Sequence, residues 1–473
     1  MSNKMNNHDD HDHKVKVIEQ FQVGPPPGSV PISISIPFSF FDLPWLFYSV
    51  TTKRIFFYEF PHPTTHFFQK VLPNLKHSLS LTLQHFFPFS SKIVFPPKPQ
   101  TPHILYSEGD TLPFIVAEST TTNLNNLVSD TPRDVTCLHP FVPILPSPHA
   151  LEDGTLLITP MAIQVTIFPN YGFTICINFY HVIADGRAFH NFMKFWASIC
   201  GSRENSIALP LHDRDMIIQD PKGLKSVFLE TLWNSPRKST LTIVRDVPSD
   251  MVRHSFVLRN DHVENLKKLV SANCQSHGLV GTLHVSTFVV TCSLIWVCKV
   301  KSEVMNTLPN GDEELYFYFW VDCRYLAKLK IPLTYFGNCL INANTAIKRN
   351  KLVGQNGIFE AAVAIGNKIR ELQSEPYKNV DTLMSCFSKF GSMEQHAVAI
   401  AGSPKFDAYE TDFGWGKPML SEVLQADSRL VSLSDCREKE GGIQVGVALG
   451  RTQMHKFNSI LEHLLADIAI KGE

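Results

Sequence analysis

The sequence predicts a mixed α/β fold built from two halves of similar size. Strand-like apolar segments alternate with helix-like segments on both sides of a stretch over 202–240, which is mixed in charge and contains several prolines. With 473 residues, 44% of them hydrophobic, the chain is long enough to bury a large core or two packed subdomains. We therefore expect an N-terminal domain over 15–205, a crossover segment over 206–240 and a C-terminal domain over 241–473.

The elements of the first half follow from hydrophobic spacing. Leucine and phenylalanine recur at helical spacing over 64–86, where Pro73 is expected to kink or restart the helix. Further along, the pattern predicts two strands joined by a Pro-Asn-Tyr-Gly turn and then a helix with large apolar side chains on one face: 156–168, 173–179 and 187–200.

The crossover and the second half are interpreted in the same way. A short helix is expected near 224–232. The pattern then predicts strands over 252–258, 315–323 and 443–449 and helices over 261–274, 285–300, 357–374 and 452–469. The apolar segment 285–300 is short for a membrane span and is interrupted by polar residues, so it predicts a buried helix.

Charge and cysteine content narrow the class of protein. The 43 basic and 44 acidic residues leave a net charge of −1, which does not indicate a nucleic-acid partner. The ten cysteines include no CxxC pair, a pattern that favours free thiols in a reducing compartment. Residues 1–14 lack the apolar core of a secretory signal, and their histidines and aspartates favour a disordered, solvated tail over a metal site. We expect a cytosolic protein without a membrane span or a metal.

The pattern HxxxD occurs four times, and its surroundings distinguish one occurrence. Three lie in a polar tail, a proline-rich loop and a surface helix, respectively: His8–Asp12, His149–Asp153 and His463–Asp467. His181 instead follows the strand 173–179, and Asp185-Gly186 forms a turn into the next helix. A strand end holds a side chain rigidly, so His181 is a candidate general base, the alternative being a histidine that merely ends a strand. Asp185 can order the turn, cap the helix or pair with an arginine.

Two motifs together resemble those of the plant BAHD acyltransferases. His181-Val-Ile-Ala-Asp185-Gly186 resembles the HxxxDG motif, and Asp412-Phe413-Gly414-Trp415-Gly416 matches the DFGWG motif in full at the expected late position. Tyr335-Phe336-Gly337-Asn338-Cys339 and Gly402-Ser403-Pro404-Lys405-Phe406 resemble the anthocyanin and flavonoid glucoside acyltransferase clade, which contains many malonyltransferases. The resemblance covers essentially the whole chain.

The resemblance implies two chloramphenicol-acetyltransferase-like α/β domains with a central solvent channel between them. It also implies that His181 acts as the general base within a ternary complex, without an acyl-enzyme. Asp185 is expected to turn away from the substrate and pair with Arg324. The sequence departs from common relatives at Ser90-Ser91, where many have Ala-Gly, and at Tyr180, where many have a second histidine. Neither departure affects the proposed base.

The DFGWG motif has two interpretations. The resemblance implies a catalytic acid or base role for Asp412 beside His181, whereas two glycines and two aromatic residues favour a packing role that shapes the CoA side of the channel. We expect a structural role for the other motif residues: Arg324, Tyr335, Gly337, Asn338, Phe413, Gly414, Trp415 and Gly416.

Several residues are candidates for binding acyl-CoA. Arg187 is expected to hold a malonyl carboxylate by two hydrogen bonds, the alternative being a solvated arginine at a helix start. Ser286 and Thr287 are expected to direct N–H and hydroxyl groups at CoA from the start of a helix, and simple N-capping is the alternative. The loop formed by Gly402, Ser403 and Lys405 is expected to approach the CoA phosphates. Gly402 permits a close approach of the backbone, and Lys405 supplies a cation.

The resemblance implies a monomeric acyl-CoA-dependent O-acyltransferase without a permanently bound cofactor. The expected reaction transfers malonyl from malonyl-CoA to a sugar hydroxyl of a flavonoid, isoflavonoid or other phenolic glucoside. A hydroxycinnamoyl-CoA donor is the first alternative, because its bulky acyl group needs an apolar pocket and no carboxylate clamp. A non-catalytic ligand-binding member of the same family is the second.

Overall fold

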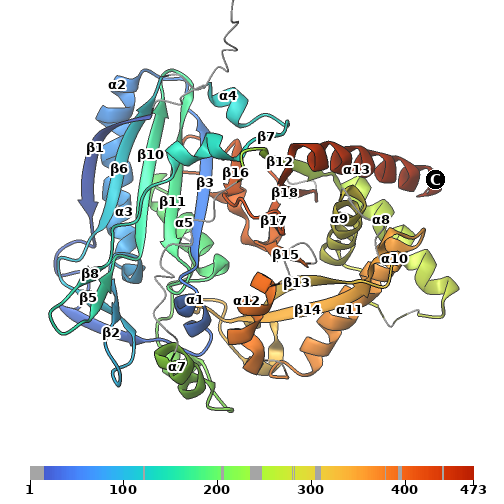
Figure 1. Ribbon diagram of the computed structural model, residues 1–473. Coiled ribbons are helices and arrows are strands. Elements are labelled where there is room, and N and C mark those ends of the chain that lie inside the picture. The colour runs from blue at the N-terminus through green and yellow to red at the C-terminus, as the bar shows by residue number, and fades with distance from the viewer. Residues whose placement is uncertain are drawn as a thin grey trace, which may run out of the picture.

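The chain folds into two α/β halves that lie side by side (Figure 1). The computed structural model describes residues 15–120, 123–203, 207–234, 248–279, 281, 283–303, 311–378, 380–392, 397–438 and 441–472. The predicted tail over 1–14 and the last part of the predicted crossover, 235–240, lie outside the described residues. Elements from the first part of the chain form the left side of Figure 1, and those from the second part form the right side.

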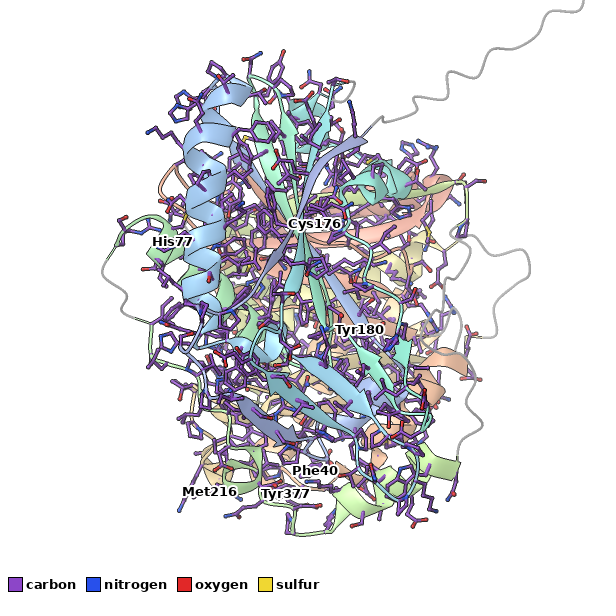
Figure 2. All side chains as sticks on the ribbon, turned by 90° about the vertical axis from the view of Figure 1, so that its left-hand side faces the viewer. Phe40, His77, Cys176, Tyr180, Met216 and Tyr377 are labelled. Carbon is purple, nitrogen blue, oxygen red and sulfur yellow. The ribbon has the colours of Figure 1, made fainter. Side chains whose placement is uncertain are left out.

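The first half is built on a six-stranded sheet. Its strands, in spatial order, are β1 (Val15–Val23), β6 (Leu112–Ser119), β10 (Met161–Phe168), β11 (Gly172–Tyr180), β3 (Thr51–Glu59) and β16 (Leu420–Val423). Every residue of β10 and β11 is buried, which explains why these two strands are almost uniformly apolar. Figure 2 views the molecule from the side of this sheet, with Cys176 and Tyr180 along β11.

The helices of the first half match the predicted spacing. The first helical segment runs from α2 (Thr64–His66) through a π-helical turn, η1 (Phe67–Val71), into α3 (Leu72–Leu83). Pro73 lies in the first turn of α3, directly after the π-helical turn, where a residue without an N–H is tolerated. The second helix, α5 (Gly186–Cys200), packs on α3, and Trp196 Nε1 donates to Leu75 O at 3.2 Å.

The second half is built on a seven-stranded sheet. Its strands, in order, are β14 (Leu340–Lys348), β13 (Glu314–Asp322), β15 (Ala397–Ala401), β17 (Leu430–Asp435), β18 (Ile443–Gly450), β12 (Met251–Leu258) and β7 (Arg133–Asp134). The helices of this half are α8 (Asn260–Ser276), α9 (Thr287–Ser302), α10 (Arg349–Val353), α11 (Gly357–Ser374), α12 (Leu383–Ser392) and α13 (Arg451–Gly472). Each strand and helix predicted for this half is present, with bounds that differ by at most three residues.

The two halves exchange strands. β16 comes from the second half of the chain but pairs with β3, and β7 comes from the first half but pairs with β12. Glu422 on β16 is buried between two arginines, with Oε1 at 2.5 Å from Arg133 Nη2 and Oε2 at 3.2 Å from Arg253 Nε. The expected division at 206–240 therefore does not separate the sheets, because hydrophobic patterning does not reveal which sheet a short strand joins.

A third sheet of five strands extends the first half, and the sequence reasoning missed it. Its strands are β2 (Ser33–Pro37), β5 (His103–Ser107), β4 (Lys92–Phe95), β9 (Leu156–Ile158) and β8 (His149–Ala150). Short helices connect the larger elements: α1 (Leu43–Phe47), α4 (Leu124–Leu127), α6 (Arg214–Ile217) and α7 (Leu224–Asn234). None of the helices in the described part of the chain combines the length and apolarity needed to cross a bilayer.

Candidate active site

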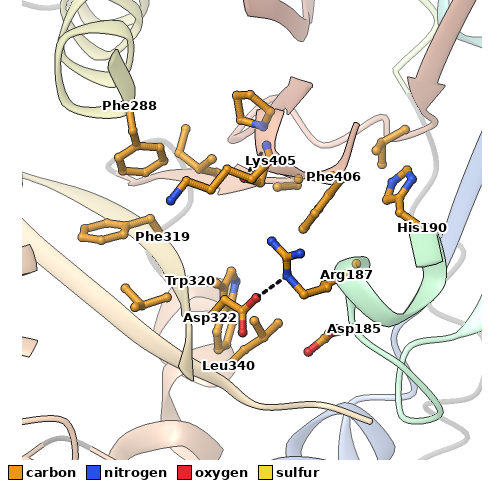
Figure 3. A pocket seen from close by; sticks show the side chains of 18 of the residues that line it. Asp185, Arg187, His190, Phe288, Phe319, Trp320, Asp322, Leu340, Lys405 and Phe406 are labelled. Atoms are coloured by element: carbon orange, nitrogen blue, oxygen red, sulfur yellow. Dashed lines mark hydrogen bonds and ion pairs between the residues drawn. The ribbon is translucent and has the colours of Figure 1, made fainter. Parts of the chain in front are cut away.

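A cavity of about 1330 Å³ is lined by residues from both halves. The end of β11 and the start of α5 contribute one wall, and β13, the start of α9 and the loop 401–407 contribute the other. Figure 3 shows Arg187 and Asp322 in direct contact in the wall of this cavity, with Lys405 and Phe406 nearby. The predicted site residues that line it are His181, Asp185, Arg187, Ser286, Thr287, Gly402, Ser403 and Lys405.

His181 is fixed at the end of β11 by backbone and ring contacts. Its backbone N–H donates to Val50 O at 2.8 Å, and its imidazole stacks on the indole of Trp45, with ring centroids 3.7 Å apart and planes inclined by 14°. Burial lowers the pKa of His181 to about 4. The imidazole is therefore neutral near neutral pH, the state in which it can accept a proton.

The hydrogen bonds of Asn338 define the tautomer of His181. Asn338 Nδ2 faces three oxygen acceptors, Asp42 Oδ1 at 3.0 Å, His181 O at 2.9 Å and Val182 O at 3.2 Å, so this atom is the amide nitrogen. Asn338 Oδ1 must then accept the hydrogen bond from His181 Nδ1 at 3.0 Å. The proton on Nδ1 leaves Nε2 with the free lone pair.

Asp185 organises the turn that follows His181. Its Oδ1 accepts the backbone N–H of Ala188 at 3.1 Å and so caps α5. Its two oxygens also accept from Arg324 Nη1 at 2.8 Å and Nη2 at 3.2 Å, and both side chains are buried. The expected pair with Arg324 is present. Because Arg324 Nη2 further donates to Tyr335 O at 2.9 Å and Gly337 O at 3.3 Å, the pair ties the His181 turn to the loop that carries Asn338.

Asp412 does not line the cavity. Its Oδ1 accepts the N–H groups of Gly414 at 2.8 Å and Gly416 at 3.0 Å, and its Oδ2 lies 3.0 Å from Arg203 Nη1. Both glycines have positive φ, of 109° and 106°, which residues with a Cβ rarely adopt. The position of Asp412 therefore does not support a catalytic role beside His181. Its carboxylate instead holds the turn of its own motif.

The aromatic residues of the DFGWG motif pack behind the site. Phe413 meets the indole of Trp196 edge-on at 4.9 Å, and Trp415 meets Phe173 at 5.2 Å. Trp196 belongs to α5 and Phe173 to β11, the two elements that hold the His181 turn. The geometry agrees with the packing interpretation of this motif.

Arg187 is already engaged by protein groups. Its Nε donates to Asp322 Oδ2 at 2.9 Å (Figure 3). Its Nη2 donates to the hydroxyl of Tyr325. The other oxygen of Asp322 accepts from Arg324 Nη1 at 2.9 Å. The guanidinium expected to hold a malonyl carboxylate by two hydrogen bonds is thus paired with Asp322, which compensates its charge.

The CoA candidates lie around the same cavity. Ser286 caps α9, its Oγ accepting the N–H of Val289 at 3.3 Å, so the capping alternative holds although Ser286 and Thr287 both line the cavity. A Cβ at Gly402 would lie 2.5 Å from Leu433 O, and its φ of 79° is positive, so this position requires glycine. Ser403 Oγ accepts the N–H of Lys405 at 3.2 Å and caps the short turn that presents the lysine.

The cavity lining also includes residues that the sequence did not assign to the site, among them Trp45, Trp320 and His190. Trp45 stacks on His181 and also contacts Trp320, with centroids 4.9 Å apart. Trp320 precedes Asp322 by two residues on β13, so the strand period places it on the same face. His190 lies one turn beyond Arg187 on α5 and stacks on Phe406 at 5.0 Å. The sequence shows that Trp320 shares a strand face with Asp322 and that His190 shares a helix face with Arg187. Only the fold shows that these faces line a cavity.

Comparison with known proteins agrees with this fold and these motifs. A profile of the transferase family matches residues 14–464. The chain belongs to this family, the BAHD acyltransferases that its motifs resemble. It is similar to coumaroyl-CoA:anthocyanidin 3-O-glucoside-6''-O-coumaroyltransferase 1 of Arabidopsis thaliana, with 37% identity over 94% of this chain and 97% of the relative. It is also similar to malonyl-coenzyme A:anthocyanin 3-O-glucoside-6''-O-malonyltransferase of Dahlia pinnata, with 35% identity over 94% and 96%.

Among solved structures, vinorine synthase has a similar fold. It aligns over 94% of this chain and 96% of its own, with a TM-score of 0.66 and 18% sequence identity. At this level of identity the likeness concerns the fold alone. It agrees with the architecture of two α/β halves.

Proposed function

We propose that this protein is an acyl-CoA-dependent O-acyltransferase that acylates a sugar hydroxyl of an anthocyanin or another phenolic glucoside. The observation that carries the proposal is the neutral His181, whose Nδ1–H is held by Asn338 and whose Nε2 is left free beside a cavity of about 1330 Å³. The named activities of relatives that match 94% of the chain support the substrate class.

The chemistry needs one group that first accepts and then donates a proton. His181 Nε2 takes the proton of the sugar hydroxyl while its oxygen attacks the thioester carbonyl carbon. The tetrahedral intermediate then collapses, the C–S bond breaks, and the imidazolium returns the proton to the departing CoA thiolate. The acyl group passes directly between the two substrates, so no acyl-enzyme forms and His181 ends the cycle neutral.

For the acyl donor, the cavity favours a hydroxycinnamoyl group. Its walls include the aromatic side chains of Phe288, Phe319 and Trp320, which offer flat apolar surface to a planar acyl group. Arg187, the residue expected to hold a malonyl carboxylate, has Asp322 as its ion-pair partner. A second carboxylate there would compete with Asp322 for the same guanidinium.

Malonyl remains a second candidate because of Lys405. Its ammonium lies 4.6 Å from the centre of the Tyr325 ring, and no carboxylate in the described ranges is within ion-pair distance of it. This cation faces the cavity and can balance either a donor carboxylate or a CoA phosphate. The Dahlia relative is named for a malonyl donor.

The test is a donor and acceptor matrix read by product mass. Purified protein is incubated with p-coumaroyl-, malonyl- and acetyl-CoA against a panel of anthocyanin and flavonoid glucosides. We expect a coumaroyl adduct on the sugar, and His181→Ala should abolish it. His463→Ala removes the histidine of an exposed HxxxD pair and serves as the matched control, which should retain full activity.

Two other results would change the proposal. A malonyl adduct that forms at least as fast as the coumaroyl adduct, and is lost selectively in Lys405→Ala or Arg187→Ala, would assign malonyl as the donor. Absence of product with every donor and acceptor, from folded protein that still binds CoA, would favour a ligand-binding member of the family.

A further inference from the structure

Arg214 is a buried arginine that the crossover segment inserts beneath the His181 turn. It begins α6 and has 1% of its surface exposed. Its Nη1 lies 2.9 Å from Asp42 Oδ2, and its Nη2 donates to Ile183 O at 2.8 Å. One guanidinium thus connects the crossover to the segment before α1 and to the turn between His181 and Asp185.

The crossover also holds the loop that carries Asn338. The N–H of Leu211 donates to Thr334 O at 2.9 Å, and the N–H of Phe336 donates to Leu211 O at 2.8 Å. Leu211 precedes Arg214 by three residues, so one short stretch contacts all three segments that surround the base. A Cβ at Gly337, beside Asn338, would lie 3.1 Å from Arg214 Nε, which shows how closely the arginine approaches this loop.

A continuous chain of hydrogen bonds leads from Arg214 to the imidazole. Asp42 accepts Arg214 through Oδ2 and accepts Asn338 through Oδ1, from the backbone N at 3.1 Å and from Nδ2 at 3.0 Å. Asn338 then accepts His181 Nδ1 at 3.0 Å. Asp42 is held further by Ser39, whose N and Oγ donate to Oδ2 at 2.8 and 2.7 Å.

We infer that Arg214 is a positioning residue for the acyl transfer: the crossover segment holds His181 in its reactive tautomer and orientation through Asp42 and Asn338. This inference rests on the proposed role of His181 as the base. It assigns to the crossover a part in catalysis, in addition to joining the two halves.

Charged groups lie on both sides of the His181 ring. Two buried ion pairs flank the imidazole, Arg214–Asp42 on the Asn338 side and Arg324–Asp185 on the α5 side. On the α5 side Arg324 also contacts Asp322, which in turn pairs with Arg187. Both groups therefore contain equal numbers of cations and carboxylates, so neither imposes a net charge on His181. Removing the charge of Arg214 alone leaves Asp42 uncompensated two hydrogen bonds from the ring, and an uncompensated anion favours the imidazolium.

The test compares the pH dependence of kcat/KM in a small set of variants. Arg214→Met should raise the acidic limb of the profile by about one pH unit, because it removes the balancing cation, and should lower kcat roughly tenfold through misplacement of the base. Asp42→Asn combined with Arg214→Met should return the limb to its wild-type position. Lys225→Met, which breaks an exposed ion pair with Asp215 in the same part of the chain, should leave both quantities unchanged.

The outcomes separate this inference from the proposed function. Wild-type protein without transferase activity would refute the proposed function itself. If the wild type is active but the acidic limb of the kcat/KM profile is unchanged in folded Arg214→Met, only the positioning role is refuted. The same holds if Lys225→Met shifts this limb as much as Arg214→Met does. If Arg214→Met does not fold, Arg214→Gln keeps an amide donor toward Asp42 without the charge and carries the same expected shift.

Discussion

Trp45 and His181 lie face to face, with ring centroids 3.7 Å apart and planes within 14° of parallel. The indole covers one face of the imidazole, while Asn338 occupies Nδ1. The ring can therefore exchange a proton only through Nε2. The indole also contributes to the burial that lowers the pKa of His181 to about 4.

The pH dependence of activity should follow from this burial. The base works when neutral, so kcat/KM should be at its plateau above the pKa of about 4 and fall as the pH decreases through that value. Trp45→Leu removes part of the indole surface that covers the His181 ring. We therefore expect the acidic limb of the kcat/KM profile to move to higher pH, toward the usual range of histidine, and kcat to fall. The profile is measured with folding monitored at each pH. An unchanged limb in Trp45→Leu would show that the indole does not set the proton affinity of the base.

The Asp185–Arg324 pair should be essential for stability. Asp185→Asn leaves Arg324 buried without its main carboxylate, and breaking a buried pair in this way typically costs about 3–5 kcal/mol. Urea unfolding measures the loss. Asp467→Asn breaks the exposed pair with His463 and should change the free energy of unfolding by less than about 1 kcal/mol. Equal effects of the two substitutions would contradict the structural role given to Asp185.

Asp412→Asn should separate packing from catalysis. The amide loses the charge that pairs with Arg203, yet its oxygen can still accept the N–H groups of Gly414 and Gly416. We expect a lower melting temperature with measurable transferase activity, whereas folded His181→Ala should be inactive. Complete inactivity of well-folded Asp412→Asn would instead indicate a direct role in the reaction.

Glu422 should make the fold sensitive to acid. Burial alone would raise the pKa of Glu422, but Arg253 and Arg133 outweigh burial and lower it to about 2, from 4.5. Because this carboxyl pKa is lower in the folded state than in the unfolded state, ionised Glu422 stabilises the fold. The stabilisation is complete above the unfolded pKa and is lost as the pH falls from about 4.5 toward 2. The linked contribution is about 3 kcal/mol. Glu422→Gln should be less stable near pH 7 and should show a weaker pH dependence of unfolding between pH 5 and 2, as measured by urea titration.

Much of the fold could be predicted from sequence because its elements have strong periodicity. The buried helix α9 and the mostly apolar, fully buried hairpin of β10 and β11 are long enough to identify locally. The five-stranded sheet and the exchange of β16 were missed, because strands of two to five residues carry little periodic signal. Partner choice in a sheet depends on contacts far apart in sequence.

For the site, motif and context located His181, and the resemblance anticipated the pair of Asp185 with Arg324. The state of Arg187 was not predictable, because whether a cation is free or compensated depends on which carboxylate the fold places beside it. The same reason hid Asp42 and Arg214, which are far from His181 in sequence but reach it through Asn338.

The pairing of β16 with β3 also constrains when the protein can fold during synthesis. Four residues near the carboxyl end of the chain complete the edge of the first sheet, with Leu420 opposite Phe57 and Glu422 opposite Ile55. Until these residues emerge from the ribosome, β3 presents an unpaired backbone edge flanked by bulky apolar side chains, a surface that invites association with other chains. The nascent amino-terminal half should therefore depend on chaperones for most of translation, and a fragment ending before Leu420 should aggregate rather than persist as an independent domain.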